Sequence, residues 1–252
     1  MKSKIFILVI ITFSQLGTNA QQFITKAKIE YEVKANIQKT MGNGTFEDML
    51  KDQMPTFKTG YYDFTFTDNK SVYKFDHWNE ESKKVPQWWR KSDEDNVWYY
   101  NYNTDRYDNQ KSLFGTLINL EDTIPKLKWR ITNDTRVIAG FNCRKAVSTI
   151  FDSVYVFAFY TDEIMISGGP CSINGLPGMI LGVTIPRLYT SWVATKVMLN
   201  NVDEGSIKPV ASKKTYTMKF LETTINDRLN DWTPDNDDEK QQRARYVWSM
   251  ML

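Results

Sequence analysis

The sequence has 252 residues, of which 41% are hydrophobic and 25% charged, and its formal net charge is +2 at pH 7. A chain of this size can bury a sizeable core in one domain or one large β-sheet. The near-balanced charge argues against nucleic acid or an anionic membrane surface as the main partner, because both usually require a basic face. Aromatic residues make up 14% of the chain, and they gather in segments of alternating polarity.

The N-terminus has the pattern of a secretory signal peptide. A short positive region, residues 1–4, precedes an uninterrupted apolar run over residues 5–13, and the small residue Ala20 stands at the cleavage position. The run is too short to span a bilayer as a mature helix. We therefore expect export, with residues 21–252 forming a single mature domain that has no transmembrane segment. A retained membrane anchor is the alternative.

Alternation with a period of two residues predicts half-buried strands near residues 29–35 and 62–66. Lys28, Glu30 and Glu32 fall on the polar side of the first segment and should face solvent. The opposite side chains should share one buried face of a sheet, and they are Ile29, Tyr31, Val33, Tyr62, Phe64 and Phe66.

Further alternating runs are separated by short turns. The turn at Asp68 and Asn69 predicts a hairpin, and a second hairpin is expected around residues 103–105. Short joints favour antiparallel pairing, because parallel strands need long crossovers. We predict a mainly β fold of about ten strands, an antiparallel curled sheet in the form of a half-barrel or a sandwich. The later strands are expected at residues 128–131, 144–151, 153–161, 179–185 and 191–199.

Helical signals are few, and two of them lie near the C-terminus. Thr45 is a candidate N-cap for a short helix over residues 45–50, and residues 217–229 carry apolar side chains at helical spacing. Thr233 then precedes a proline and an acidic run at residues 235–239, the pattern of a helix start. The charged stretch over residues 79–96 is expected to be a protruding loop.

The two cysteines, Cys143 and Cys171, are predicted to form a disulfide. Two cysteines in an exported chain are most simply paired. A redox-active thiol or a metal site is the alternative, but the chain has no Cys-x-x-Cys pair, and its single histidine, His77, is distant in sequence. We therefore expect neither a metal nor a cofactor.

Residues 168–181 are the most distinctive segment, because they are apolar yet repeatedly broken by glycine and proline. Gly175 and Gly178 permit backbone angles closed to other residues, and Pro177 fixes a turn between them. The apolar side chains of this turn should plug one end of the sheet, and docking of a partner is the alternative. The residues of this motif are Gly169, Pro170, Gly175, Leu176, Pro177, Gly178, Met179 and Ile180.

Residues 129–196 resemble the GLPGLI family of exported bacterial proteins. The hexapeptide at residues 175–180 carries Met179 where the family name has leucine, and the flanking patterns at residues 138–146 and 158–164 also match. The resemblance implies a Gram-negative bacterium and therefore a location in the periplasm or on the cell surface. It implies no activity.

Candidate chemistry is sparse. His77 lies near no serine motif and Gly-x-Ser-x-Gly is absent, so a catalytic triad has no basis. Asp162 and Glu163 could do acid–base work, but adjacent residues on a strand point to opposite faces. An aromatic and basic segment could instead be a stacking platform for sugars, peptides or lipid headgroups, or it could fold back on the sheet; its residues are Trp88, Trp89 and Arg90.

The leading functional hypothesis is an exported, non-enzymatic binding or carrier protein that holds an apolar or amphipathic ligand against an aromatic concave face. The alternatives are an accessory subunit of an outer-membrane assembly that docks through the Gly-Leu-Pro-Gly turn, and an enzyme that uses Asp162 and Glu163. A large apolar cavity would favour the carrier, and an exposed apolar patch at Leu176 and Met179 the accessory subunit. Convergent buried ionisable groups would favour the enzyme.

Overall fold

The structure is a computed structural model that describes residues 24–41, 45–67, 69–200 and 202–252. The expected signal peptide, its cleavage position at Ala20 and the expected mature N-terminus at Gln21 lie outside the described residues. Asp68 of the first predicted hairpin turn also lies outside them.

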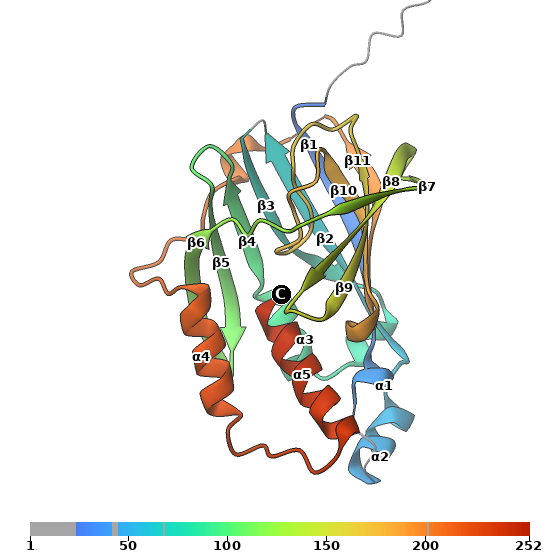
Figure 1. Cartoon of the computed structure of the whole chain (residues 1–252), viewed down its shortest axis with the longest axis vertical. Coiled ribbons are helices and arrows are strands. Elements are labelled where there is room, and N and C mark those ends of the chain that lie inside the picture. The colour runs from blue at the N-terminus through green and yellow to red at the C-terminus, as the bar shows by residue number, and fades with distance from the viewer. Residues whose placement is uncertain (1–23, 42–44, 68, 201) are drawn as a thin grey trace, which may run out of the picture.

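One antiparallel sheet of eleven strands forms the body of the protein (Figure 1). Its strand order is β6-β5-β4-β3-β2-β1-β11-β10-β9-β8-β7, so β6 and β7 are its two edges and the sheet is not closed. The predicted mainly β, antiparallel, curled architecture is confirmed. The strands are β1 Ala27–Asn36, β2 Phe57–Thr67, β3 Lys70–Trp78, β4 Val97–Asn101, β5 Arg106–Leu113, β6 Thr116–Thr123, β7 Arg130–Ile138, β8 Phe141–Ile150, β9 Val154–Thr161, β10 Met179–Ile185 and β11 Thr190–Met198.

The chain builds this sheet as two meanders that meet in the middle. Strand β1 pairs with β2 on one side and with β11, the last strand, on the other. The first meander runs from β1 to the edge strand β6, and residues 124–129 then lead across to β7 at the opposite edge, as Figure 1 shows. The second meander returns from β7 to β11. Each half therefore supplies part of one shared inner face.

Aromatic side chains fill the inner face. The predicted register of the first two strands is confirmed, because all six side chains assigned to the buried face are at most 8% exposed. Lys28, Glu30 and Glu32 lie on the other face but are half-buried rather than free in solvent. Lys28 forms an ion pair with Asp63 at 2.7 Å, and the Glu30 carboxylate accepts a hydrogen bond from Thr195.

Helices and short 3-10 turns surround the sheet. Thr217 caps α4 as expected, since its hydroxyl accepts a hydrogen bond from the Phe220 amide at 3.2 Å. Residues 79–96 are not the loop that the sequence predicted, because most of them form a 3-10 turn and a helix. The elements are α1 Ile37–Thr40, α2 Thr45–Gln53, η1 Glu81–Lys84, α3 Gln87–Glu94, η2 Pro186–Leu188, η3 Glu204–Ser206, α4 Met218–Arg228 and α5 Asp237–Met251.

The start of α5 differs from the expectation. Asn236, not Thr233, is its N-cap, and the Asn236 side chain accepts a hydrogen bond from the Glu239 amide at 2.9 Å. The Glu239 carboxylate accepts one in return from the Asp235 amide at 3.0 Å. This reciprocal pair satisfies amides at the helix start, so the helix begins after the proline-containing turn. Among the described residues, no helix is long and apolar enough to cross a membrane.

A candidate ligand pocket beneath the C-terminal helix

The Gly/Pro-rich segment between β9 and β10 plugs one part of the inner face. Leu176 is 1% exposed and Ile180 is fully buried, which confirms the predicted plug. Tyrosine and tryptophan side chains of the sheet and its crossover satisfy the backbone carbonyls of this segment. Tyr31 donates to the carbonyl of Ile180, and Trp129 donates to that of Asn174 at 2.9 Å.

Two glycines of the motif allow this close approach. A Cβ atom at Gly178, where φ is +147°, would lie 2.1 Å from the carbonyl oxygen of Thr161. A Cβ atom at Gly169 would lie 2.3 Å from the carbonyl oxygen of Ile173. Any other residue would force the backbone of the plug off the sheet. The distinctive composition of the motif therefore follows from packing.

The predicted disulfide between Cys143 and Cys171 is not formed, and both are buried free thiols. Cys143 lies on β8 and donates to the Phe141 carbonyl at 3.6 Å. Cys171 lies on the plug, where its neighbours Tyr73 and Trp192 belong to β3 and β11. The strand order separates β8 from β11 by two strands. Burial raises the pKa of the Cys143 thiol to about 11 and that of Cys171 to about 12.

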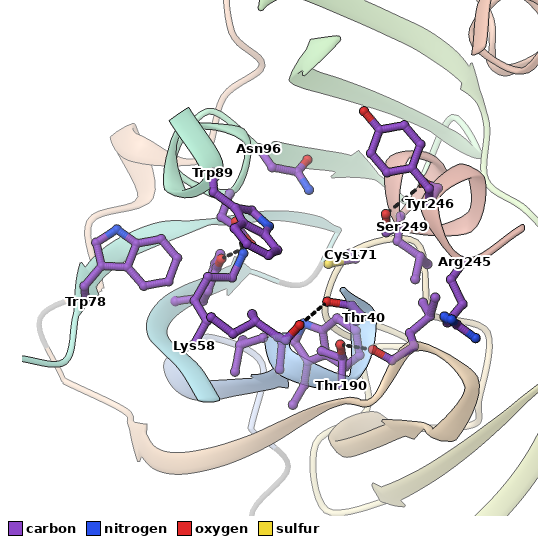
Figure 2. A pocket seen from close by; sticks show the side chains of 18 of the residues that line it. Thr40, Lys58, Trp78, Trp89, Asn96, Cys171, Thr190, Arg245, Tyr246 and Ser249 are labelled. Atoms are coloured by element: carbon purple, nitrogen blue, oxygen red, sulfur yellow. Dashed lines mark hydrogen bonds and ion pairs between the residues drawn. The ribbon is translucent and has the colours of Figure 1, made fainter. Parts of the chain in front are cut away.

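A pocket of about 270 Å³ lies next to the plug, between the inner face of the sheet and α5 (Figure 2). Strands β1, β2, β3 and β11 supply its floor, α3 supplies one wall, and α5 lies over it. Figure 2 shows Trp89 of α3 on one side and Tyr246 and Ser249 of α5 on the other. Aromatic rings dominate the lining, and they belong to Tyr62, Tyr73, Trp78, Trp89, Trp192, Trp232 and Tyr246.

The polar groups on the α3 side of the pocket are paired with one another. Lys58 of β2 forms an ion pair with Asp93 of α3 at 2.5 Å. The Tyr62 hydroxyl donates to the same carboxylate at 3.3 Å, and the Lys58 ammonium lies 5.7 Å from the centre of the Trp78 ring. These contacts hold α3 against the sheet and use both oxygens of the Asp93 carboxylate.

The floor holds a polar atom with no partner among the described residues. The Tyr73 hydroxyl is buried and makes no hydrogen bond of standard geometry, although Cys171 and Trp192 lie beside it. Burial raises the pKa of Tyr73 well above its ordinary value, so the phenol stays neutral. Tyr62 stacks on this ring with the centroids 5.2 Å apart and the planes at 3°.

The three residues of the predicted stacking platform, Trp88, Trp89 and Arg90, do not share one site in the structure. Trp89 lines the pocket, whereas Trp88 is 72% exposed on the outside of α3. The Arg90 side chain donates to the Val85 carbonyl at 2.9 Å, so it braces the start of the helix. The candidate catalytic pair, Asp162 and Glu163, does not line the pocket.

His77, the single histidine of the chain, does not line the pocket. His77 lies on the outer face, stacked on Tyr61 with the centroids 4.6 Å apart. Sequence reasoning did not find Trp192, Trp232 or Arg245 as pocket residues. The strand alternation around Trp192 was a usable signal for an inward ring, but nothing local placed the late helix over the same face.

The architecture is thus a curled antiparallel sheet that holds a plug and a pocket on one face, and sequence comparison gives its family. A family model described as "N-glycanase peptide, N-terminal domain" matches residues 93–218, which is half of the chain. The chain belongs to this family of N-glycanase N-terminal domains, and the membership agrees with an exported protein. No curated protein matches the chain in sequence.

Solved structures show the same fold in a longer protein. Two crystal forms of PNGF-II each match with a TM-score of 0.50 at 16% sequence identity, over 75% and 76% of this chain. The matches cover 31% and 32% of PNGF-II, so the chain spans less than a third of that protein. An uncharacterized conserved protein from Thermus thermophilus is more distant, with a TM-score of 0.38 at 9% identity over 75% of this chain and 88% of that one.

Proposed function

We propose that this protein is an exported, non-enzymatic binding or carrier protein that holds an apolar or amphipathic ligand in the pocket beneath α5. The observation that carries the proposal is the aromatic lining of this pocket, which combines ring faces with a few fixed polar groups. Ligand sites in proteins typically have this composition. A volume of about 270 Å³ lies near the lower end of the range of ligand pockets, about 300 Å³, so the pocket suits a small molecule.

The location of the protein is part of the proposal. The leader-like sequence and the resemblance to the GLPGLI family support the periplasm or the cell surface of a Gram-negative bacterium. The match to an N-terminal domain family supports a role beside catalysis, because this chain corresponds to less than a third of PNGF-II. We assign no substrate of PNGF-II to this chain.

The residues named for the two alternative functions are not placed as those functions require. Leu176 and Met179 are buried, so the Gly-Leu-Pro-Gly turn presents no apolar patch to an outer-membrane partner. Asp162 is exposed and Glu163 is half-buried outside the pocket, so these carboxylates do not converge on a bound molecule. Neither observation supports the docking subunit or the carboxylate-dependent enzyme.

The proposal can be tested with a neutral fluorescent probe, N-phenyl-1-naphthylamine. Ser249→Phe should weaken its binding about tenfold or more, which corresponds to about 1.4 kcal/mol, because the new ring would occupy the pocket from α5. Gln241→Phe is the matched control, since Gln241 is exposed on the same helix and does not line the pocket. Fluorescence titration gives both dissociation constants.

Two outcomes would overturn the proposal. One is the absence of probe binding to the unmodified protein, and the other is equal binding by the two variants. A ligand retained in the pocket would mask the titration, so the protein should be analysed by native mass spectrometry before and after unfolding and refolding. A co-purifying small molecule that is lost in Ser249→Phe but kept in Gln241→Phe would support the same conclusion.

A further inference from the structure

Positive side chains outnumber negative ones in the lining of the pocket. Three charged side chains line it, namely Lys58, Asp93 and Arg245. The ion pair between Lys58 and Asp93 cancels two of them. Arg245 takes part in no ion pair with any residue that the structure describes. Among the charged side chains of the lining, Arg245 is therefore the one without an ion-pair partner.

Arg245 is held at the pocket by packing and has an unused donor. Its guanidinium lies over the ring of Tyr189, 5.8 Å from the centroid. Its Nε atom is buried and has no hydrogen-bond partner among the described residues. Figure 2 shows the side chain extending from α5 along the side of the pocket opposite Trp78 and Trp89. A buried donor without an acceptor is unfavourable, and no hydrogen bond joins this guanidinium to any residue that the structure describes.

Further cations lie on the same side without acidic partners. The Lys39 ammonium lies near the same Tyr189 ring, 5.5 Å from its centre. Arg187 of η2 stacks over Trp248 at 5.8 Å and donates to the Ser153 hydroxyl at 3.1 Å. Neither cation appears in an ion pair within the described part of the chain. Together with Arg245 they place three positive side chains around Tyr189 and Trp248, and clustered cations attract anions.

The geometry points to an amphipathic organic anion as the ligand class, and this inference rests on the proposed binding function. We infer that a ring-bearing apolar body lies against Trp89 and Trp192, while a single carboxylate or similar anionic group is bound by Arg245. A guanidinium is suited to this role, because its planar set of N–H donors matches a carboxylate.

The test uses two probes that differ only in charge, indole-3-acetate and indole-3-acetamide. Both should displace N-phenyl-1-naphthylamine, and the acetate should bind about tenfold more tightly than the amide at low salt. Arg245→Met should remove this preference and leave the affinity for the amide unchanged. Lys240→Met is the matched control, because it removes the same charge from an exposed position of α5 outside the pocket.

The outcomes separate this inference from the proposed function. Equal affinities for acetate and amide, with probe binding still blocked in Ser249→Phe, would overturn the anion assignment and leave the binding function standing. Loss of acetate preference in Lys240→Met as well would show a diffuse charge effect and also overturn it. If Arg245→Met does not fold, Arg245→Lys decides, because it keeps the positive charge but loses the planar set of donors that matches a carboxylate. An acetate preference that stays unchanged in Arg245→Lys would refute the assignment to the guanidinium.

Discussion

The plug and the pocket occupy the same inner face of one sheet, yet they are packed in opposite ways. In the plug, Leu176 and Ile180 fill the space so closely that two glycines are needed for the backbone to fit. Around the pocket, α5 lies over the sheet with long and polar side chains, and a space of about 270 Å³ is left. The difference indicates that this face is sealed by the motif segment and left open for binding under the late helix.

The hydrogen bonding of buried polar groups also differs between the plug and the pocket. Backbone carbonyls of the plug receive hydrogen bonds from Tyr31, Tyr100 and Trp129. Around the pocket, Tyr73 and Arg245 keep buried polar atoms without partners among the described residues. Buried groups in native proteins are usually satisfied, and two of the five side-chain atoms that break this rule among the described residues belong to residues that line the pocket.

A charge introduced into the plug should have the largest effect on the stability of the protein. Leu176→Asp should lower the free energy of unfolding by about 4 kcal/mol, because it places a carboxylate where no partner is available. Met165→Asp is the control in the same segment, since Met165 is 63% exposed, and it should cost less than about 0.5 kcal/mol. Urea denaturation followed by tryptophan fluorescence measures both. Similar losses in the two variants would contradict the role of Leu176 as a plug.

The next largest effect is a pH dependence of stability that comes from a buried lysine. Lys111 of β5 is 5% exposed, and its ammonium donates to the carbonyl of Met250 in α5 at 2.9 Å. Burial lowers the pKa of Lys111 to about 8, whereas an unfolded lysine titrates near about 10.4. Between these values the unfolded chain binds more protons than the folded one, so stability rises with pH.

The expected gain is about 2 kcal/mol between about pH 8 and about pH 10. Above that range, buried tyrosines such as Tyr31 and Tyr73 should reverse the trend, because burial raises their pKa in the folded state. Lys111→Met should abolish the rise, and Lys126→Met should keep it, since the Lys126 side chain is 83% exposed. Denaturation curves at several pH values would show this. A rise that persists in Lys111→Met would assign it to another group.

Local sequence patterns correctly predicted those parts of the structure that neighbouring residues determine. The alternation at residues 29–35 and 62–66 indicated the correct buried face, and the Gly/Pro motif indicated the plug. Strand β6 was missed, although Ile118 and Leu120 alternate inward, because Leu117 breaks the polar side of the pattern with a side chain that is 52% exposed. The pairing of β1 with β11 has no local signal at all.

The candidate site was only partly predictable for the same reason. Its aromatic character could be expected from the strands, but its shape depends on α5, which meets residues on β1, β3 and α3 that are distant in sequence. Arg245 was not predicted as a pocket residue, because nothing local in the sequence places its helix over the sheet. The disulfide prediction was wrong because pairing two cysteines from the compartment alone ignores that the fold gives Cys143 and Cys171 different neighbours.

The smallest effect should come from the two adjacent tryptophans that the sequence could not tell apart. On a helix, consecutive side chains are rotated by about 100°, and α3 accordingly turns Trp89 to the pocket and leaves Trp88 72% exposed. Trp89→Ala should weaken binding of N-phenyl-1-naphthylamine about fivefold, near 1 kcal/mol, through the loss of a ring contact. Trp88→Ala should leave the affinity unchanged, although the two rings stack with centroids 5.7 Å apart. If Trp88→Ala weakened binding as much as Trp89→Ala, the ligand would lie on the outer surface of α3 and not between that helix and α5.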